Sequence, residues 1–270
     1  MSKSLITSII ILVVGVAAIM PFVSQKAPTQ IANEKSKKDL PKTALVKPKP
    51  VVKTIELVER LPDFKTITDV KTKKRTFFEY LKPMVLEVNE QIASDRAFLL
   101  TLKRTPTDTN SIQRFKGLVR QYRVKQALSF DKKRQQLLSR VDILPVELVL
   151  MQAANESGWG TSRFAVQANN LFGQWCFKVG CGVVPEGRPE GKTYEVRKFA
   201  RPVDSIKSYF RNLNTGYAYE ELRKLRQTLR AMKQDIDPYI VAEGLTPYST
   251  RRDEYVLEIQ NMIRVNKKYI

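Results

Sequence analysis

Residues 144–162 read LPVELVLMQAANESGWGTS, and this segment predicts the central helix of the protein. The side chains of residues 146–154 are apolar on almost every side, which is typical of a helix buried inside a domain. Pro145 suits the first position of a helix, because its missing N–H would have no helical partner there. Gly158 and Gly160 follow the apolar run and are expected to stop the helix.

Glu156 lies at the end of this predicted helix, with Trp159 close behind it. An unpaired carboxylate in an apolar interior is costly, so a carboxyl group in this position should have a raised pKa. A carboxyl group with a raised pKa is what a glycosidase uses as its general acid. The alternative is an ordinary solvated glutamate at a helix end. Glu156 is therefore the first candidate for a catalytic acid.

A second motif, NNLFGQW at 169–175, follows the first motif, ESGWG at 156–160. Together they resemble the glucosaminidase family (glycoside hydrolase family 73), in which a Glu-Ser-Gly-Trp-Gly block precedes Asn-Leu-Phe-Gly. The segments QWC at 174–176 and GCG at 180–182 look like the Bax branch of that family. The resemblance covers roughly residues 144–270. Two blocks in the right order are far more specific than either block alone.

The resemblance implies a mainly α fold, in which a lysozyme-like helical domain carries a small β-hairpin lobe after the catalytic helix. The Gly- and Pro-rich segment 174–199 fits that lobe, because 183–184 and 193–196 read as short strands around a turn. The substrate cleft would lie between the helices and this lobe. Upstream, the apolar spacing from residue 76 onward predicts helices, and Pro83 is expected to kink the first of them or to separate two.

The sequence predicts four regions: a signal or transmembrane segment at 1–25, a disordered Pro- and Lys-rich linker at 26–53, a helical supporting region at 54–140 and the catalytic domain at 141–270. Ser4 to Gln25 carry no charge and are about as long as a membrane span. We expect an uncleaved anchor, with a cleaved signal peptide as the alternative.

The expected location is the cell envelope, on the periplasmic or extracytoplasmic face and anchored in the inner membrane, or secreted if the signal is cleaved. The cysteines and the sugar chemistry favour this location. The lysines directly after the apolar segment oppose it, because positive charge tends to stay on the cytoplasmic side of a membrane.

Composition excludes several kinds of site. The chain has no histidine and two cysteines, so Ser-His and Cys-His nucleophile pairs, histidine-ligated metals and four-cysteine zinc sites are all absent. We expect neither a metal nor a cofactor. The net charge of +20 suits an anionic partner such as the cell wall or lipid phosphates. No nucleic-acid motif is present, and we expect no nucleic-acid partner.

Most glycosidases need a second group opposite the acid. Glu195 is our first choice for this catalytic role, because a strand holds a carboxylate better than a turn does. Glu186 and Glu190 lie in the Gly/Pro turn and are the alternatives. In the family, a glutamate of the hairpin is credited with this second role, and the position of Glu186 in the sequence also matches that glutamate. The substrate's own acetamido group is a further alternative.

Aromatic rings and polar groups should line a sugar cleft. Tyr219 is a catalytic candidate, since the family carries a functional tyrosine after the helix that follows the hairpin; Tyr217 fits that spacing less well. The candidate substrate-binding residues are Ser157, Trp159, Asn170, Phe172, Gly173, Trp175 and Glu186. Cys176 and Cys181 could form a disulfide within the lobe in an oxidising compartment, or remain two free thiols.

These observations predict a peptidoglycan hydrolase that binds the glycan strands of the cell wall and reaches the membrane through its N-terminal segment. It would be an endo-β-N-acetylglucosaminidase that cuts β-1,4 bonds with Glu156 as general acid. A lytic transglycosylase of the same fold is the first rival, although its usual Gly-Leu-Met-Gln segment is replaced here by Asn-Leu-Phe-Gly at 170–173. A non-catalytic peptidoglycan-binding or scaffold protein is the second.

Overall fold

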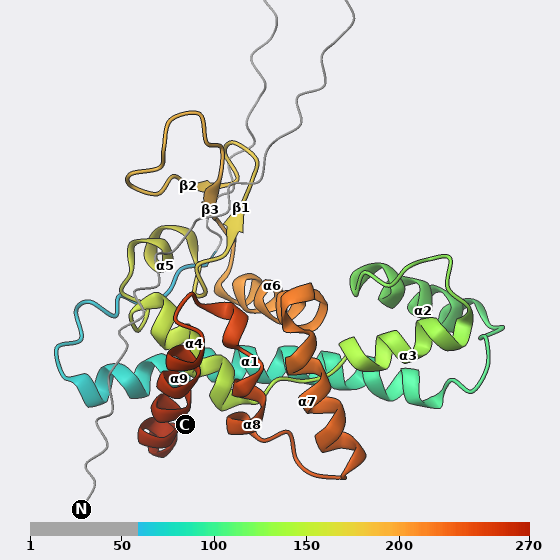
Figure 1. Cartoon of the computed structure of the whole chain (residues 1–270). Helices are drawn as coiled ribbons and strands as arrows, with labels where there is room; N and C mark the ends of the chain where they lie inside the picture. The colour runs from blue at the N-terminus through green and yellow to red at the C-terminus, as the bar shows by residue number, and fades with distance from the viewer. Residues whose placement is uncertain (1–58) are drawn as a thin grey trace, which may run out of the picture. The chain divides into compact units, whose positions relative to one another are not determined.

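Helices make up most of the computed structural model, which describes residues 59–270 (Figure 1). The α-helices are α1 (Val70–Thr101), α2 (Thr109–Gln121), α3 (Phe130–Arg140), α4 (Val146–Ser157), α5 (Arg163–Ala168), α6 (Pro202–Thr215), α7 (Glu220–Ala231), α8 (Pro238–Glu243) and α9 (Asp253–Asn266). The 3-10 turns are η1 (Tyr217–Tyr219), η2 (Thr246–Tyr248) and η3 (Lys267–Tyr269). The mainly helical class predicted from the sequence is confirmed.

Helix α4 lies at the centre and packs against α1, α8 and α9. Its apolar side chains between Leu148 and Ala154 are almost completely buried, as the sequence predicts. Gly158 ends the helix in the left-handed conformation, with φ 56°, where glycine has no Cβ to clash. Pro145 is the residue before the helix rather than its first residue, because its ψ of 133° is extended.

Helix α1 belongs to the predicted supporting region, 54–140, and packs directly on α4 and α6. Pro83 lies inside α1, so of the two alternatives, a kink or a separation into two helices, the separation is wrong. Pro83 and Glu79, whose carbonyl loses its helical partner, are both exposed to water. The opposite face of α1, which includes Phe77 and Leu81, is buried and holds the helix in place.

The β lobe is a three-stranded antiparallel sheet in the order β1-β3-β2, formed by β1 (Trp175–Cys176), β2 (Gly182–Val183) and β3 (Glu195–Arg197). It lies beyond α5 and α6, away from the other helices (Figure 1). Trp175 pairs with Val196, and Gly182 pairs with Arg197. A Cβ on Gly182 would lie 2.0 Å from the carbonyl oxygen of Val196, so this close approach of the strands requires glycine.

Within residues 59–270, no helix combines the length and hydropathy that a membrane crossing requires. The expected membrane segment at 1–25 and the expected linker at 26–53 lie outside the described residues.

Candidate functional site

A cleft of about 1440 Å³, open to solvent, lies between the helices and the β lobe. The helical wall comes from the end of α4, from α6, and from η1 and η2, while the segment 172–177 and β3 form the wall on the lobe side. Five residues predicted for the site line it: Glu156, Phe172, Gly173, Trp175 and Tyr219. Two sequence motifs and one distant tyrosine are thus brought to a single cleft.

Glu156 is half-buried at the C-terminal end of α4. Burial raises the pKa of its carboxyl group, and the hydrogen bond from Tyr255 acts in the opposite direction without cancelling this effect. The Tyr255 hydroxyl donates to Glu156 Oε1 at 2.8 Å. A raised pKa keeps more of this carboxyl group protonated near neutral pH, as a general acid requires.

A chain of hydrogen bonds leads into the interior from Glu156. Gln152 Nε2 donates to the Tyr255 hydroxyl at 2.9 Å, and the Tyr209 hydroxyl donates to Gln152 Oε1. Burial raises the pKa of both Tyr255 and Tyr209, so their hydroxyls remain protonated donors. Donors oriented along one chain polarise each other and fix the position of the Glu156 carboxyl group.

Neither Tyr255 nor Gln152 is among the residues that the sequence predicted for the site. Gln152 is 0% exposed and lies one helical turn before Glu156, on the same face of α4. A glutamine inside an otherwise apolar run, four residues before the acid, is a signal that could have identified it. Tyr255 is distant in sequence, and no local pattern connects it with Glu156.

Three residues predicted to bind substrate, Ser157, Trp159 and Asn170, do not line the cleft, and each makes contacts that hold the fold instead. Ser157 is buried, and its hydroxyl donates to the Ala153 carbonyl oxygen at 2.6 Å and accepts from Gly160 N at 2.8 Å. Trp159 packs edge-on against Phe77 of α1. Its indole faces α1, and it does not line the cleft.

Asn170, the third, is 1% exposed and connects the residue before β1 with the end of β3, the central strand of the lobe. Its amide donates to the carbonyl oxygens of Gln174 and Arg197, both at 2.9 Å, and its side-chain oxygen accepts from Gln174 N at 3.0 Å. This side chain therefore shapes the turn that carries Phe172 and Gly173 into the cleft.

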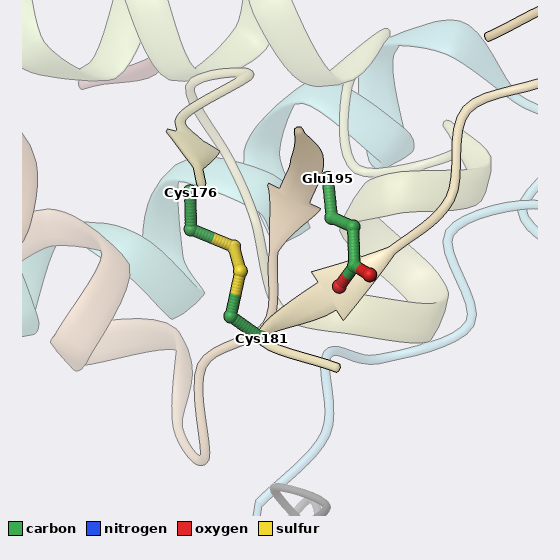
Figure 2. Close-up of side chains that lie close together, drawn as sticks. All are labelled: Cys176, Cys181 and Glu195. Atoms are coloured by element: carbon green, nitrogen blue, oxygen red, sulfur yellow. A yellow bond between two sulfur atoms is a disulfide. The ribbon is translucent and has the colours of Figure 1, made fainter. Parts of the chain in front are cut away.

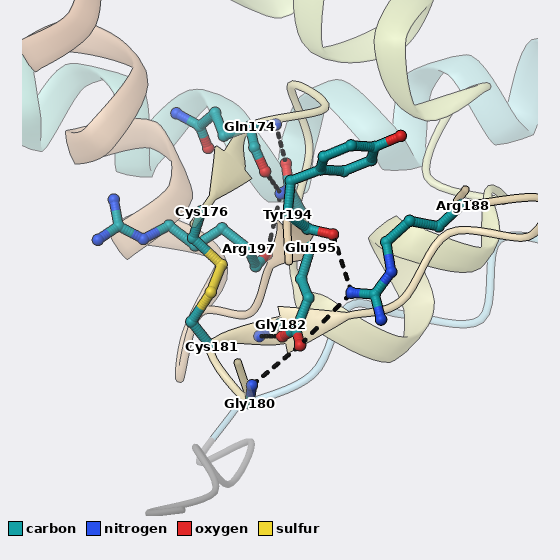
Figure 3. Close-up of a disulfide and its surroundings, with 10 residues drawn as sticks. Gln174, Cys176, Gly180, Cys181, Gly182, Arg188, Tyr194, Glu195 and Arg197 are labelled. Atoms are coloured by element: carbon teal, nitrogen blue, oxygen red, sulfur yellow. Dashed lines mark hydrogen bonds and ion pairs between the residues drawn. A yellow bond between two sulfur atoms is a disulfide. The ribbon is translucent and has the colours of Figure 1, made fainter. Parts of the chain in front are cut away.

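Glu195 is turned into the lobe and is 3% exposed (Figure 3). Its carboxylate accepts hydrogen bonds from Gly180 N at 2.9 Å and Gly182 N at 2.7 Å, and Arg188 lies 4.0 Å away. It does not line the cleft. Glu186, whose side chain is 86% exposed, pairs with Arg163 at 3.2 Å on the lobe surface.

Cys176 and Cys181 form a disulfide beside Glu195 (Figure 2). The two sulfur atoms and a Glu195 oxygen lie within 4.8 Å of one another, the spacing of a metal site. The sulfurs are bonded to each other, however, and the carboxylate already holds two backbone N–H groups. This group is therefore a covalent and hydrogen-bonded clamp on the loop 177–180, without the thiolates that a metal would need.

Comparison with known proteins agrees with this arrangement. The family model described as mannosyl-glycoprotein endo-beta-N-acetylglucosaminidase matches residues 131–268, which include every residue of the cleft lining except Arg123. Protein bax of Escherichia coli (strain K12) is 32% identical over 215 residues, which cover 78% of this chain and 76% of that protein. No solved structure gives a significant match. The chain belongs to the glucosaminidase family.

Proposed function

We propose that the protein is a peptidoglycan hydrolase, an endo-β-N-acetylglucosaminidase with Glu156 as its general acid. Membership of the glucosaminidase family indicates a glycosidase related to peptidoglycan. The observation that carries the proposal further is the carboxyl group of Glu156, which has a raised pKa and lies in the cleft between the helices and the lobe.

In the proposed reaction, Glu156 gives its proton to the glycosidic oxygen while the bond from that oxygen to C1 breaks, and the electron pair of the bond stays on the leaving oxygen. The Tyr255 hydroxyl then stabilises the new carboxylate through the bond it already makes to Oε1. Aromatic side chains at the cleft, among them Trp175 and Tyr219, would bind the faces of the sugar rings.

For the second group we propose the acetamido oxygen of the substrate, which attacks C1 and forms a cyclic intermediate. Water then opens this intermediate and gives its proton to Glu156. Within residues 59–270, Glu156 is the one carboxylate that lines the cleft, which supports this choice. Glu195 is held by two backbone donors, and Glu186 and Glu190 are exposed on the lobe.

The stereochemistry of the product tests this second step. Attack by the acetamido group followed by water retains the β configuration at the new reducing end, and proton NMR during early turnover detects that anomer. An initial α anomer would show direct attack by water and would reassign the second role to a lobe carboxylate such as Glu186.

The bond specificity is tested by digesting purified peptidoglycan with the full-length protein and identifying the new ends by mass spectrometry after reduction. The proposal predicts reduced N-acetylglucosamine ends. Ends with 1,6-anhydro-muramic acid would instead identify a lytic transglycosylase. Binding to the cell wall without any new ends would identify a non-catalytic binding protein.

We also propose that the protein acts in the cell envelope and is anchored through residues 1–25. The disulfide Cys176–Cys181 supports this, because disulfides persist in oxidising compartments such as the periplasm. A reporter fused after residue 25 that is active only outside the cytoplasm is the expected result. Activity confined to the cytoplasm would overturn this location.

A further inference from the structure

Three arginines from separate parts of the chain line the cleft that contains Glu156. Arg123 lies in the connection between α2 and α3, Arg197 is on β3 of the lobe, and Arg211 is on α6. The cleft is thus cationic on both of its walls. Glu156 is the one acidic residue in its lining among residues 59–270.

The guanidinium groups of these arginines make no hydrogen bond or ion pair with any side chain in the described part of the chain, residues 59–270. Other arginines of the same protein do find carboxylates: Arg188 lies next to Glu195, and Arg163 pairs with Glu186. The cleft arginines therefore leave their donors available to a ligand.

The backbone at two of these positions is firmly held. Arg197 N donates to the Gln174 carbonyl oxygen at 2.8 Å, and the buried Asn170 amide donates to the Arg197 carbonyl oxygen at 2.9 Å. The Arg197 side chain extends to the side of β3 away from Arg188 (Figure 3). The carbonyl oxygen of Arg123 accepts from Arg140 at 2.8 Å. These arginines thus project from an ordered frame.

A neutral N-acetylglucosamine chain gives such a set of cations nothing to pair with, since its sugar faces suit aromatic rings and its acetamido groups suit neutral polar partners. A carboxylate matches the planar fork of a guanidinium group. Clefts lined by one sign of charge also concentrate ligands of the opposite sign. The lining therefore fits a glycan that carries carboxylates at intervals.

We propose that Arg123, Arg197 and Arg211 form a carboxylate-binding subsite that selects acidic glycan strands over neutral ones, an inference that rests on the proposed function. Two groups on a cell-wall glycan supply this chemistry: the lactyl carboxylate of a muramic acid without its peptide, and the carboxylates of the peptide itself. The subsite recognises a carboxylate in either case.

Binding is measured by titration calorimetry with the full-length protein carrying Glu156→Gln, so that the ligand is not cut. Three ligands are compared: chitotetraose, which is neutral; a peptide-free tetrasaccharide of alternating N-acetylglucosamine and N-acetylmuramic acid; and the same tetrasaccharide with its peptides. The second and third ligands separate the lactyl carboxylate from the peptide carboxylates as the source of recognition.

Arg197→Gln and Arg211→Gln should each weaken binding of an acidic tetrasaccharide about tenfold, as expected for the loss of a hydrogen bond between charged groups. Binding of chitotetraose should change less than twofold. Arg75→Gln is the control, because Arg75 is an exposed arginine on α1 outside the cleft lining, and it removes the same net charge. Raising the salt concentration should weaken binding of the acidic ligands only.

Equal losses for neutral and acidic ligands would overturn the subsite and leave the proposed function standing, because the arginines would then serve only the shape of the cleft. The subsite would also be overturned, and the proposed function would stand, if the protein with all three arginines bound chitotetraose and both acidic ligands with equal affinity at every salt concentration. No binding of any of the three glycans would overturn the proposed function and the subsite together.

Discussion

Removing the Tyr255 hydroxyl tests how the protein sets the pKa of its proposed acid. Tyr255→Phe keeps the ring, which stacks on Tyr248 with centroids 5.5 Å apart, and deletes the donor that lies 2.8 Å from Glu156 Oε1. This bond favours the ionised carboxyl group, whereas burial disfavours it. The pKa of Glu156 should therefore rise further in the variant.

The size of the effect follows from the kind of bond that is lost. A hydrogen bond to a charged group contributes about 1.5–3 kcal/mol, and this stabilisation is absent when the carboxylate forms during proton transfer. We therefore expect kcat to fall about 10- to 100-fold. The variant also leaves Gln152 Nε2 without its acceptor, so a loss of about 1–3 kcal/mol in unfolding free energy is expected.

The assay is the pH dependence of kcat/KM on soluble peptidoglycan fragments, because this profile reports the pKa of the acid in the free enzyme. Activity should decline as the pH rises through the pKa of Glu156, and in Tyr255→Phe this decline should begin at a higher pH. Tyr217→Phe is the control, because Tyr217 is 91% exposed and lies outside the cleft lining. A decline at unchanged or lower pH in a folded Tyr255→Phe protein would refute the reasoning.

Three further predictions concern stability. Glu195→Gln should lower the unfolding free energy by about 1.5–3 kcal/mol, because the carboxylate accepts hydrogen bonds from Gly180 N and Gly182 N. Urea unfolding measures this loss. A variant with full stability but no activity would restore Glu195 to a catalytic role. Replacing both Cys176 and Cys181 by serine should cost about 2 kcal/mol for so short a loop, and an unchanged melting curve would contradict it. Glu156→Gln should stabilise the protein, and the gain should be larger at high pH. Folding raises the pKa of Glu156, so the unsubstituted protein loses stability as the pH rises through that pKa and the buried carboxyl group ionises. Glutamine does not ionise and avoids this loss. A gain that is larger in acid would contradict the direction of the shift.

Much of the cleft could be anticipated because its signals are local. The apolar run of α4 predicted that Glu156 lies at the end of a buried helix, which the structure confirms. The Asn-Leu-Phe-Gly motif at 170–173 predicted Phe172 and Gly173 for the site, and both line the cleft with Glu156. The burial and the ending of α4 at Gly158 depend on residues within a few positions of each other, so a single segment contains the necessary information.

The remaining features depend on contacts between distant residues. The position of Glu195 on a predicted strand made it a candidate, but its surroundings are set by the loop that the disulfide closes over it. Tyr255 reaches Glu156 only through the packing of α9 on α4. Pro83 stays within α1 because the buried face of that helix outweighs one lost backbone hydrogen bond.

The central claim is that Glu156 protonates the leaving oxygen, and a pair of substrates tests it most directly. The natural glycan needs that proton, whereas a chitooligosaccharide with a 2,4-dinitrophenyl leaving group does not, because dinitrophenolate leaves without protonation. We predict that Glu156→Gln in the full-length protein lowers kcat/KM on the natural glycan by about 10²–10⁴ and leaves the dinitrophenyl substrate far less affected. Equal losses on both substrates, or full activity on the natural glycan, would contradict the assignment of Glu156 as the acid.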